Sequence, residues 1–455
     1  MAKKKLNRRS FLTKAGLGGA AIAAPGLIVG KDRIQTQRIA RTERPAHSYS
    51  PSDTIQIALI GAGGMGGLDT DTALQVPGVE IVAACDLYDG RLSAAKERYG
   101  DHLVTTRDYR EILQREDVDA VIIATPDHFH QEISSAALMA GKSVYCEKPM
   151  VHSLDEGPLV IQSQSDSRKI FQVGSQGMSS LGNEKARELL AAGAIGELNY
   201  AEGFWARNSP QGAWQYKIPD DGSPETVDWE TFLRNGPERE WDPLRFFRWR
   251  NYRDYGTGVS GDLFVHLFSS LHFITGSIGP ERIYASGGLR FWKDGREVPD
   301  VMLGVFDYPE TAEHPGFNLS LRVNFVDGTS GTTYLRLVGS EGAMDVEWRK
   351  VTLYKNKKQE AKDPFLQGKM AEMTGGYKRA GMLPPPKVIY EVEEDYKGAH
   401  FDHFYKFFEG VRTDNPVAED AVFGYRAAAP ALACNMSYFE DRVVRWDPST
   451  MGVSE

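Results

Sequence analysis

Three side chains have the chemistry for proton transfer at a polarised oxygen: Lys148, Asp262 and His266. Lys148 stands in a Glu-Lys-Pro sequence at the end of an apolar run, where its charge could stabilise a developing alkoxide. Asp262 and His266 are four residues apart in a helical pattern over residues 260–276, so they share one helix face. His266 is a candidate general acid or base expected to titrate near neutrality, and Asp262 would orient the substrate or the imidazole. The sequence does not decide whether Lys148 or His266 takes the proton. A lone helical histidine is more often structural, so the set depends on the elements that position it.

A glycine-rich turn follows the apolar run over residues 55–60. Its glycines, Gly61, Gly63 and Gly66, have the spacing G-x-G-x-x-G and precede a helix-like segment. This order predicts a strand, a tight turn and a helix N-terminus facing a pyrophosphate, although the motif alone is weak in a chain with 46 glycines. Asp86 ends the next apolar run, 20 residues beyond Gly66, where a carboxylate would accept ribose hydroxyls. Such a carboxylate would repel a 2′-phosphate, which favours NAD over NADP as the cofactor.

Strand-like and helix-like segments alternate over residues 54–176. This alternation predicts an α/β Rossmann domain with a parallel sheet, right-handed crossovers and helices on both faces. Ligands of such sheets gather at the carboxyl ends of the strands. The candidate cofactor-binding residues are therefore Gly61, Ala62, Gly63, Gly64, Met65, Gly66, Asp86, Thr125, Pro126, His130, Glu147, Lys148 and Gln176.

The pattern changes beyond Gln176. Residues 282–355 alternate apolar and polar positions between turn residues, which predicts a large open, mainly antiparallel sheet with one solvated face. We expect an α+β substrate and oligomerisation domain over residues 177–415 and a C-terminal helical segment over residues 416–455. Because the outer face of such a sheet often meets another subunit, we expect a homo-oligomer, either a dimer or a tetramer.

A long irregular segment over residues 206–261 is rich in tryptophan, tyrosine and arginine. Segments of this kind are usually functional or disordered, and this one has too many aromatic residues for disorder. Flat aromatic faces and arginine forks suit the C–H faces of sugars and their hydroxyls or carboxylates. The candidate substrate-binding residues are Trp249, Arg250, Tyr255, Asp262 and His266. Aromatic packing of a loop, or an oligomer contact, is the alternative.

Several motifs together resemble the glucose–fructose oxidoreductase / inositol dehydrogenase / MocA family. They are GAGGMGG, the strand-end Asp86, ATPDHFH, AGKSVYCEKPM and GDLFVH, and the likeness covers roughly residues 54–447. Glu-Lys-Pro is the most specific of them. The resemblance implies a Rossmann domain with a nicotinamide cofactor, catalytic roles for Lys148, Asp262 and His266, and a C-terminal region that packs near the first domain.

The N-terminus has the features of a targeting segment. Within residues 1–30, a basic region leads into Asn7-Arg8-Arg9-Ser10-Phe11-Leu12, which resembles a twin-arginine export signal. The apolar stretch behind it is short and contains Pro25, so it is a poor membrane span, and we expect none in the mature form. A polar linker is expected over residues 31–53.

Composition excludes several classes of protein. The chain of 455 residues is 41% hydrophobic and 25% charged, as is ordinary for a soluble protein of two domains. Its net charge of −9, without basic runs beyond the N-terminus, argues against a nucleic-acid partner. Three scattered cysteines indicate neither a disulfide framework nor a metal centre.

These features together predict an exported, periplasmic NAD(P)-dependent oxidoreductase. It would act on a sugar, polyol or glycoside by hydride transfer at a secondary carbinol. Because no free NAD pool exists outside the cytoplasm, its cofactor would be tightly bound and recycled on the protein. Two alternatives stay open: an NAD-dependent glycosidase or lyase using transient oxidation, and a non-catalytic sugar-binding protein on the same scaffold.

Overall fold

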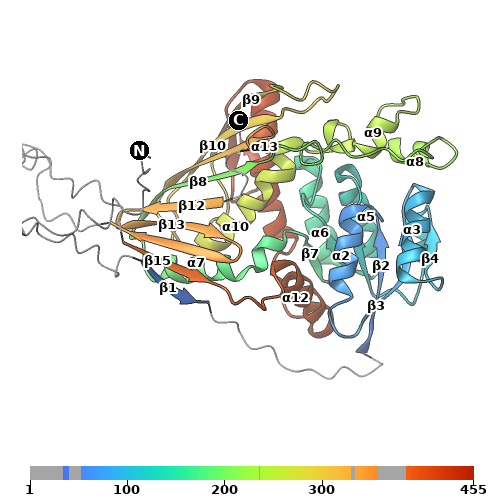
Figure 1. The fold of residues 1–455 in the computed structure, drawn as a ribbon, viewed down its shortest axis with the longest axis horizontal. Helices are drawn as coiled ribbons and strands as arrows, with labels where there is room; N and C mark the ends of the chain where they lie inside the picture. The colour runs from blue at the N-terminus through green and yellow to red at the C-terminus, as the bar shows by residue number, and fades with distance from the viewer. Residues whose placement is uncertain (1–33, 40–52, 235, 329–333, 357–385, 455) are drawn as a thin grey trace, which may run out of the picture.

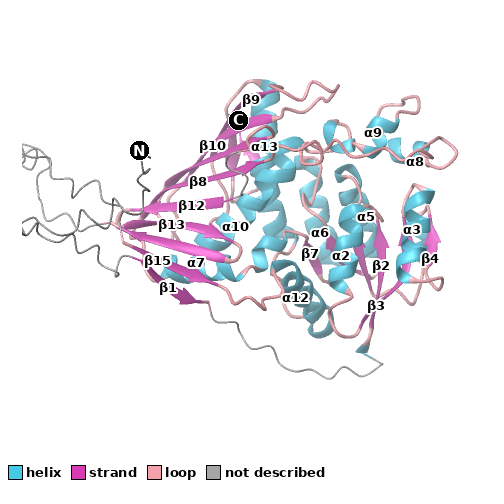
Figure 2. Cartoon of the chain, in the orientation of Figure 1, coloured by secondary structure: helices cyan, strands magenta, loops and turns pink. Residues whose placement is uncertain are grey.

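The computed structural model describes residues 34–39, 53–234, 236–328, 334–356 and 386–454. Two sheets dominate it, with helices packed between and around them (Figure 1, Figure 2). One is a six-stranded parallel sheet and the other is a larger, mostly antiparallel sheet. This confirms the predicted combination of a Rossmann domain with a domain built on an open sheet.

The smaller sheet has the strand order β4-β3-β2-β5-β6-β7, and every neighbouring pair is parallel. Its strands are β2 (Ile55–Ile60), β3 (Val79–Cys85), β4 (Val104–Thr106), β5 (Ala120–Ile123), β6 (Ser143–Cys146) and β7 (Phe171–Val173). Its helices are α2 (Gly64–Ala73), α3 (Asp89–Tyr99), α4 (Tyr109–Leu113), α5 (His130–Met139) and α6 (Gly157–Ser167), with short 3₁₀ turns η3 (Asp127–Phe129), η4 (Leu154–Glu156) and η5 (Gln176–Ser179). The strand order reverses between β2 and β5, which opens a ligand crevice at the carboxyl ends of these strands.

The larger sheet has eleven strands within the described residues, in the order β1-β15-β14-β13-β12-β8-β11-β10-β9-β16-β17. The strands are β1 (Ile34–Arg38), β8 (Leu198–Ala206), β9 (Arg282–Gly288), β10 (Val301–Tyr308), β11 (Phe317–Asn324), β12 (Tyr334–Gly339), β13 (Gly342–Glu347), β14 (Lys350–Lys355), β15 (Lys387–Glu391), β16 (Val444–Asp447) and β17 (Gly452–Ser454). Neighbours are antiparallel except β8–β11 and β1–β15. Along β10, Met302 and Phe306 are buried whereas Leu303 and Val305 are exposed, so one face packs and the other meets solvent.

Helices α7 (Leu181–Ala191), α10 (Val265–Thr275) and α13 (Ala421–Glu440) lie on the inner face of this sheet, whereas α12 (Ala399–Thr413) packs against α2 and η5. The shorter elements of this part of the chain are α8 (Trp229–Leu233), α9 (Pro243–Phe247), the 3₁₀ turn η6 (Trp249–Asn251) and the π-helical turn η7 (Ser260–Phe264). Helix α10 packs against α7 and α13, and α13 also packs on β9. The helical layer therefore lies between the two sheets (Figure 2).

The chain returns to the first domain earlier than the expected boundary at residue 416. Phenylalanines of α12, among them Phe404 and Phe407, are buried in one cluster with residues of the parallel sheet. The ring of Tyr145 on β6 stacks on Phe404 with a centroid distance of 4.2 Å. Helix α13 then packs against α6 and β7. Both C-terminal helices thus fix the orientation of the two domains.

Residues Ile34–Arg38, inside the expected linker, form the edge strand β1. They pair in parallel with Lys387–Glu391 of β15, and all five side chains are exposed. The exposed edge position explains why the polar sequence has no alternating hydrophobic pattern. The expected export signal at residues 1–30 lies outside the described residues. Among those described, no helix is long and apolar enough to cross a membrane.

Candidate active site

The glycine turn between β2 and α2 has the shape that a dinucleotide needs. Gly61 has a φ of +97°, and a Cβ there would lie 2.6 Å from the Ala124 carbonyl. A Cβ on Gly66 would clash with the carbonyl oxygen of Gly61, so the helix can start close to the strand only with glycine. At Gly64 there is open space on the side where a Cβ would project, and a Cβ on Gly63 would only touch the Arg91 side chain, at 3.8 Å. The turn therefore leaves its backbone accessible for a pyrophosphate at the N-terminus of α2.

Ala62 and Met65 lie in the same turn, and both side chains are half-buried rather than packed in the core. Together with the exposed Gly64, they leave this edge of the sheet open. The residues present thus fit a dinucleotide at the position that the sequence predicts.

Asp86 lies at the end of β3 beside a cavity of about 190 Å³. Its Oδ1 accepts a hydrogen bond from the Tyr88 backbone N–H (3.0 Å) and lies 3.4 Å from Arg91 Nη1. Gly61, Thr125 and Asp86 all line this cavity, which places the glycine turn and the ends of β3 and β5 around one space. An adenosine would occupy this position in a Rossmann domain, with its ribose at the acid.

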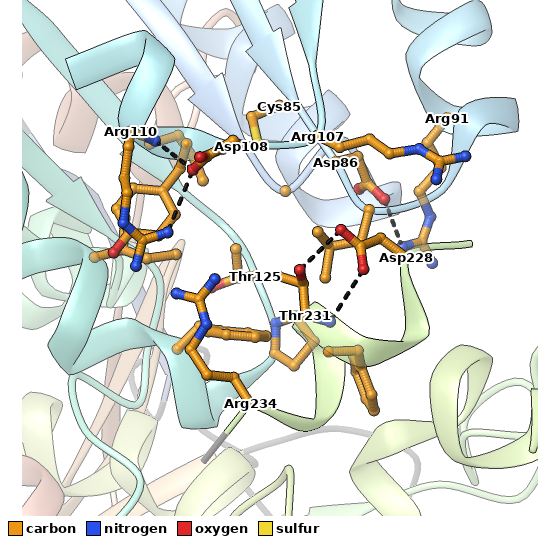
Figure 3. Close-up of a pocket in the computed structure, with 18 of the residues that line it drawn as sticks. Cys85, Asp86, Arg91, Arg107, Asp108, Arg110, Thr125, Asp228, Thr231 and Arg234 are labelled. Atoms are coloured by element: carbon orange, nitrogen blue, oxygen red, sulfur yellow. Dashed lines mark hydrogen bonds and ion pairs between the residues drawn. The ribbon is translucent and has the colours of Figure 1, made fainter. Parts of the chain in front are cut away.

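The far wall of the adenosine cavity comes from the second domain. Asp228, Thr231, Phe232, Arg234 and Phe246, in or beside α8 and α9, line it opposite the strand ends (Figure 3). In Figure 1 this part of the chain reaches out from the second domain over α3 and α5.

Backbone and ionic contacts fasten this wall to the Rossmann domain. The Asp228 N–H donates to the Leu87 carbonyl (2.8 Å), and the Asp89 N–H donates to the Thr226 carbonyl (3.0 Å). Arg234 pairs with Glu132 of α5 at 2.9 Å. We call residues 226–234 and 236–247 the adenosine roof, because this part of the chain lines the cavity opposite the strand ends.

His130 connects the two strand ends that carry Thr125-Pro126 and Lys148-Pro149. Its Nδ1 lies 2.7 Å from the Pro149 carbonyl and its Nε2 lies 3.0 Å from the Thr125 carbonyl. Burial opposes protonation of the ring, but Cys146, Asp127 and the Pro149 carbonyl outweigh it and raise the pKa of His130 to about 10. Both ring nitrogens are engaged by carbonyls, so any contribution to cofactor binding passes through the loops that His130 joins.

Glu147 and Gln176 form a buried pair behind Lys148. Gln176 Nε2 donates to Glu147 Oε1 at 2.6 Å, and both side chains are almost fully buried. Burial, reinforced by the nearby Asp69, raises the pKa of Glu147 to about 8. Glu147 is therefore largely protonated at neutral pH and presents no charge on this side of Lys148.

Lys148 and Asp262 form a buried ion pair between the two domains. Lys148 Nζ donates to Asp262 Oδ1 (2.9 Å) and to the Asp262 backbone carbonyl (3.1 Å). Arg250 Nε also reaches Asp262 Oδ1, at 3.3 Å. Burial favours the neutral acid, but Lys148, Arg250 and Arg207 outweigh it and hold the pKa of Asp262 below its usual range. Asp262 is therefore ionised throughout the physiological range.

His266 lies one turn further along, where η7 passes into α10. Its ring stacks on Trp205 with a centroid distance of 5.0 Å, beside a cavity of about 260 Å³ that also contacts Trp348, Asn183 and Ser270. Burial and the charge of Lys148 lower the pKa of His266 to about 3, against a smaller opposing effect of Asp262. The expectation that His266 titrates near neutrality is thus wrong for the free protein, because the desolvated site disfavours a second cation beside Lys148. The imidazole is neutral, and within the described residues its Nδ1 has no hydrogen-bond partner.

Two family profiles match this chain over most of its length. The first, an oxidoreductase family with an NAD-binding Rossmann fold, matches residues 55–175, and the second, the C-terminal alpha/beta domain of the same oxidoreductase family, matches residues 187–445. The chain belongs to the Gfo/Idh/MocA family. Its first domain is therefore the NAD-binding Rossmann domain of this oxidoreductase family, as its motifs predict.

This chain is similar to several known proteins over part of their length. An inositol 2-dehydrogenase of Rubrobacter xylanophilus is 32% identical over 160 residues, 35% of this chain and 45% of that protein. A glycosyl hydrolase family 109 protein of Streptomyces niveus is 29% identical over 227 residues, 44% of this chain and 45% of that protein. The matched part thus spans less than half of each relative. The structure of levoglucosan dehydrogenase with NADH and levoglucosan shares the fold, with a TM-score of 0.61, 18% identity, and coverage of 86% of this chain and 99% of that chain.

The predicted substrate-binding residues of this Gfo/Idh/MocA protein fall in different places. Arg250 reaches Asp262 of the Lys148–Asp262 pair, and its guanidinium carbon lies 4.1 Å from the centre of the Trp249 ring. Tyr255 is fully buried and packs against Phe232 of the adenosine roof, with ring centroids 4.6 Å apart. Arg250 is thus in the site, Trp249 supports it, and a direct role for Trp249 or Tyr255 in substrate binding stays a prediction.

Sequence reasoning missed two residues of strand β8 and its end, Trp205 and Arg207. Trp205 stacks on His266, and Arg207 influences the ionisation of both Asp262 and His266. The sequence did contain a signal for both residues, because alternate residues of a strand point to the same face. Trp205 and Arg207 therefore share the face of β8 on which Gly203 meets Leu267 of α10. Trp348, in the turn between β13 and β14, was missed as well and lies beside Gly177.

Proposed function

We propose that this protein oxidises or reduces a secondary carbinol of a sugar, polyol or glycoside, using Lys148, Asp262 and His266. The observation that carries the proposal is the buried Lys148–Asp262 pair at 2.9 Å, with the neutral His266 beside it and the Rossmann strand ends behind it. A cation, a proton acceptor and a carboxylate in one desolvated place meet the requirements for moving a proton at a carbinol oxygen.

The three side chains have different capacities. A protonated lysine only donates hydrogen bonds, so Lys148 would hold the carbinol oxygen and stabilise negative charge on it. The neutral His266 offers a lone pair and would accept the hydroxyl proton, and Asp262 would stabilise the imidazolium and orient Lys148. NAD, when bound, supplies the hydride acceptor for the carbinol carbon.

We further propose that the cofactor is NAD and that it is held tightly. Asp86 at the ribose position disfavours a 2′-phosphate, and the adenosine roof closes the cavity from the second domain. Tight retention accords with export through the twin-arginine pathway to the periplasm, which the N-terminal sequence indicates. Such an enzyme would regenerate its cofactor without releasing it from the protein. A homo-oligomer, as proposed from the open sheet, is compatible with this.

A second candidate is an NAD-dependent glycosidase that oxidises its substrate only transiently. The similarity to a glycosyl hydrolase family 109 protein favours it, and so does the adenosine roof, because a reaction without net redox change needs no cofactor exchange. Release of an aglycone from a chromogenic glycoside, without accumulation of reduced nicotinamide, would distinguish it from a net oxidoreductase.

The deciding experiment combines cofactor analysis with a substrate panel. Mass spectrometry of the nucleotide released on denaturation should find NAD, and absorbance at 340 nm should change with at least one sugar, polyol or glycoside. Wild-type protein that releases no nicotinamide nucleotide and responds to no member of the panel would contradict the proposal and favour the non-catalytic alternative.

Retention of NAD can be tested through the Arg234–Glu132 ion pair, which joins the adenosine roof to α5. Glu132→Gln weakens the contact with Arg234, so we expect NAD to dissociate about tenfold faster, in line with the loss of one charged hydrogen bond. Asp117→Asn, which alters the exposed pair with Arg115, is the matched control and should release NAD at the wild-type rate. Equal release rates in all three proteins would show that the roof does not retain the cofactor.

A further inference from the structure

The cluster formed by Lys148, Arg250, Arg207 and Asp262 carries more positive than negative charge. Lys148, Arg250 and Arg207 all act on the ionisation of Asp262. Asp262 already accepts a hydrogen bond from Lys148 on its carboxylate, and its backbone carbonyl accepts another. One buried carboxylate thus faces three cations.

The second acid near these groups does not restore the balance. Asp127 lies within electrostatic reach of Arg250, but its Oδ2 accepts hydrogen bonds from the Thr257 N–H (2.9 Å) and hydroxyl (2.8 Å). Lys148, Arg250 and Arg207 thus share two carboxylates, and His130, whose pKa is raised to about 10, adds a further positive charge near Asp127. His266 is neutral and Glu147 is largely protonated, so neither adds negative charge.

Arg207 is the cation without a structural counter-ion. Its Nη1 donates to the Gly212 carbonyl at 3.0 Å, and its guanidinium carbon lies 5.7 Å from the Trp205 ring and 5.8 Å from the Phe325 ring. In the described part of the chain, no carboxylate oxygen lies within 4.0 Å of this guanidinium. Trp205 in turn stacks on His266, so Arg207 stands one side chain away from the proposed base.

Arg250 also keeps donors free. Only its Nε is used, for Asp262, and no hydrogen bond from its two terminal nitrogens is found among the described residues. A guanidinium whose parallel donors are free matches the geometry of a carboxylate or a sulfate. A half-buried cation without a partner is costly, so such an arrangement is typical of a site that binds an anion.

We propose that the substrate is an anionic sugar, whose negatively charged substituent lies between Arg207 and Arg250 while its carbinol lies at Lys148 and His266. This inference rests on the proposed function for the reacting carbinol. The cavity beside His266, which Trp205 and Trp348 line, would receive the sugar ring. Glu347 also lines this cavity, and its carboxylate is paired with Lys350 at 2.8 Å. A carboxylate in a uronic acid and a sulfate ester on a neutral sugar both supply the anionic group.

Matched sugars test the inference on the purified, NAD-loaded full chain. The panel contains methyl glycosides of glucose, galactose and mannose, each as the neutral parent, the uronide and the 6-sulfate. Binding is measured by calorimetry and turnover by absorbance at 340 nm. We expect at least one uronide or sulfate to bind at least tenfold more tightly than its neutral parent, and the better of the two identifies the anionic group.

Variants locate the charge that is responsible. Arg207→Gln should reduce the preference for the anionic ligand over its neutral parent about tenfold or more, whatever its effect on the neutral parent. Arg322→Gln is the matched control, because Arg322 lies on the opposite, exposed face of the same sheet over the Phe204 ring. If Arg207→Gln does not fold, the wild-type comparison of neutral and anionic sugars still decides the question.

The outcomes separate this inference from the proposed function. Neutral sugars that bind as well as their anionic counterparts, or no anionic sugar that binds, would overturn the inference even where a neutral sugar is oxidised. Anionic sugars that bind through Arg207 but are neither oxidised nor reduced would support the inference and contradict the proposed reaction.

Discussion

Two buried acids flank Lys148, and their ionisation is opposite. Glu147 lies on the side of the Rossmann core, where burial raises its pKa to about 8. Asp262 lies on the side of the second domain, where burial acts in the same direction but Lys148, Arg250 and Arg207 hold its pKa below its usual range. Burial alone therefore does not decide the charge of an acid in this site, and the arrangement of cations does.

The two sides of Lys148 therefore differ in charge. Behind it, Glu147 and Gln176 form a neutral hydrogen-bonded support at 2.6 Å. In front of it, the ion pair with Asp262 and the neutral His266 face the second domain. Lys148 thus lies between a neutral hydrogen-bonded pair and an ionic cluster, and the ionic cluster is where we propose that the reaction takes place.

The largest effect should come from Asp262→Asn, which removes the negative charge that pairs with Lys148. This variant leaves Lys148 and Arg250 buried without their common counter-ion, so we expect a loss of about 3–5 kcal/mol in unfolding free energy and at least about 100-fold in turnover. Urea unfolding at pH 7 and the 340 nm assay measure these losses.

Asp345→Asn provides the control for that variant. Asp345 pairs with Arg336 at 2.8 Å on the other face of the large sheet, where both groups are partly exposed, so the expected change in stability is about 0–1 kcal/mol. Similar losses in the two variants would contradict the special position of Asp262.

On the neutral side of Lys148, Glu147→Gln should change how the free energy of unfolding depends on pH. The folded-state pKa of Glu147, about 8, is above its unfolded value of 4.5, so the folded state holds a proton that the unfolded state has lost between these pH values. Its contribution to stability is complete below pH 4.5 and is lost as the pH rises toward 8, with a slope of up to about 1.4 kcal/mol per pH unit. Glu147→Gln should flatten this decline in urea titrations between pH 5 and pH 8. An unchanged slope would mean that Glu147 is ionised in the folded protein.

A smaller effect is expected at the cofactor end, with Asp86→Asn. The contact of Asp86 with Arg91 is long at 3.4 Å, so stability should change by less than about 1 kcal/mol. Affinity for NAD should fall about tenfold, whereas discrimination against NADP should decrease, because the repelling charge is gone. Calorimetry with both nucleotides on the stripped protein measures the change. A variant that keeps the wild-type ratio of the two affinities would separate Asp86 from cofactor choice.

The Rossmann half and its strand-end residues could be predicted because local rules determine them. Gly61 and Gly66 are required by a positive φ and by close packing of strand and helix, which the sequence shows as spacing. Asp86, Thr125 and Lys148 follow buried strands of a parallel sheet, so they must meet at one edge. Membership of the Gfo/Idh/MocA family followed from these same motifs.

The adenosine roof and the cation excess could not be predicted in the same way. The roof depends on where an irregular segment crosses another domain, and contacts such as Arg234–Glu132 span about a hundred positions in the chain without any periodic pattern. Arg207 lies on a predictable strand face, but the finding that no carboxylate of the described residues lies within 4.0 Å of it depends on the three-dimensional structure. The pKa of His266 likewise depends on its distance from Lys148, which the chain order does not reveal.

The most direct test of the account is Lys148→Met, with cofactor content and turnover measured on the same preparation. Methionine keeps most of the volume and removes the charge, while Arg250 still balances Asp262. The account predicts that the variant retains NAD at the wild-type stoichiometry and loses about 10²–10⁴-fold in turnover of a sugar that the wild type oxidises. Turnover within threefold of the wild-type value would contradict the catalytic assignment of Lys148, and so would a loss of activity fully explained by loss of bound NAD.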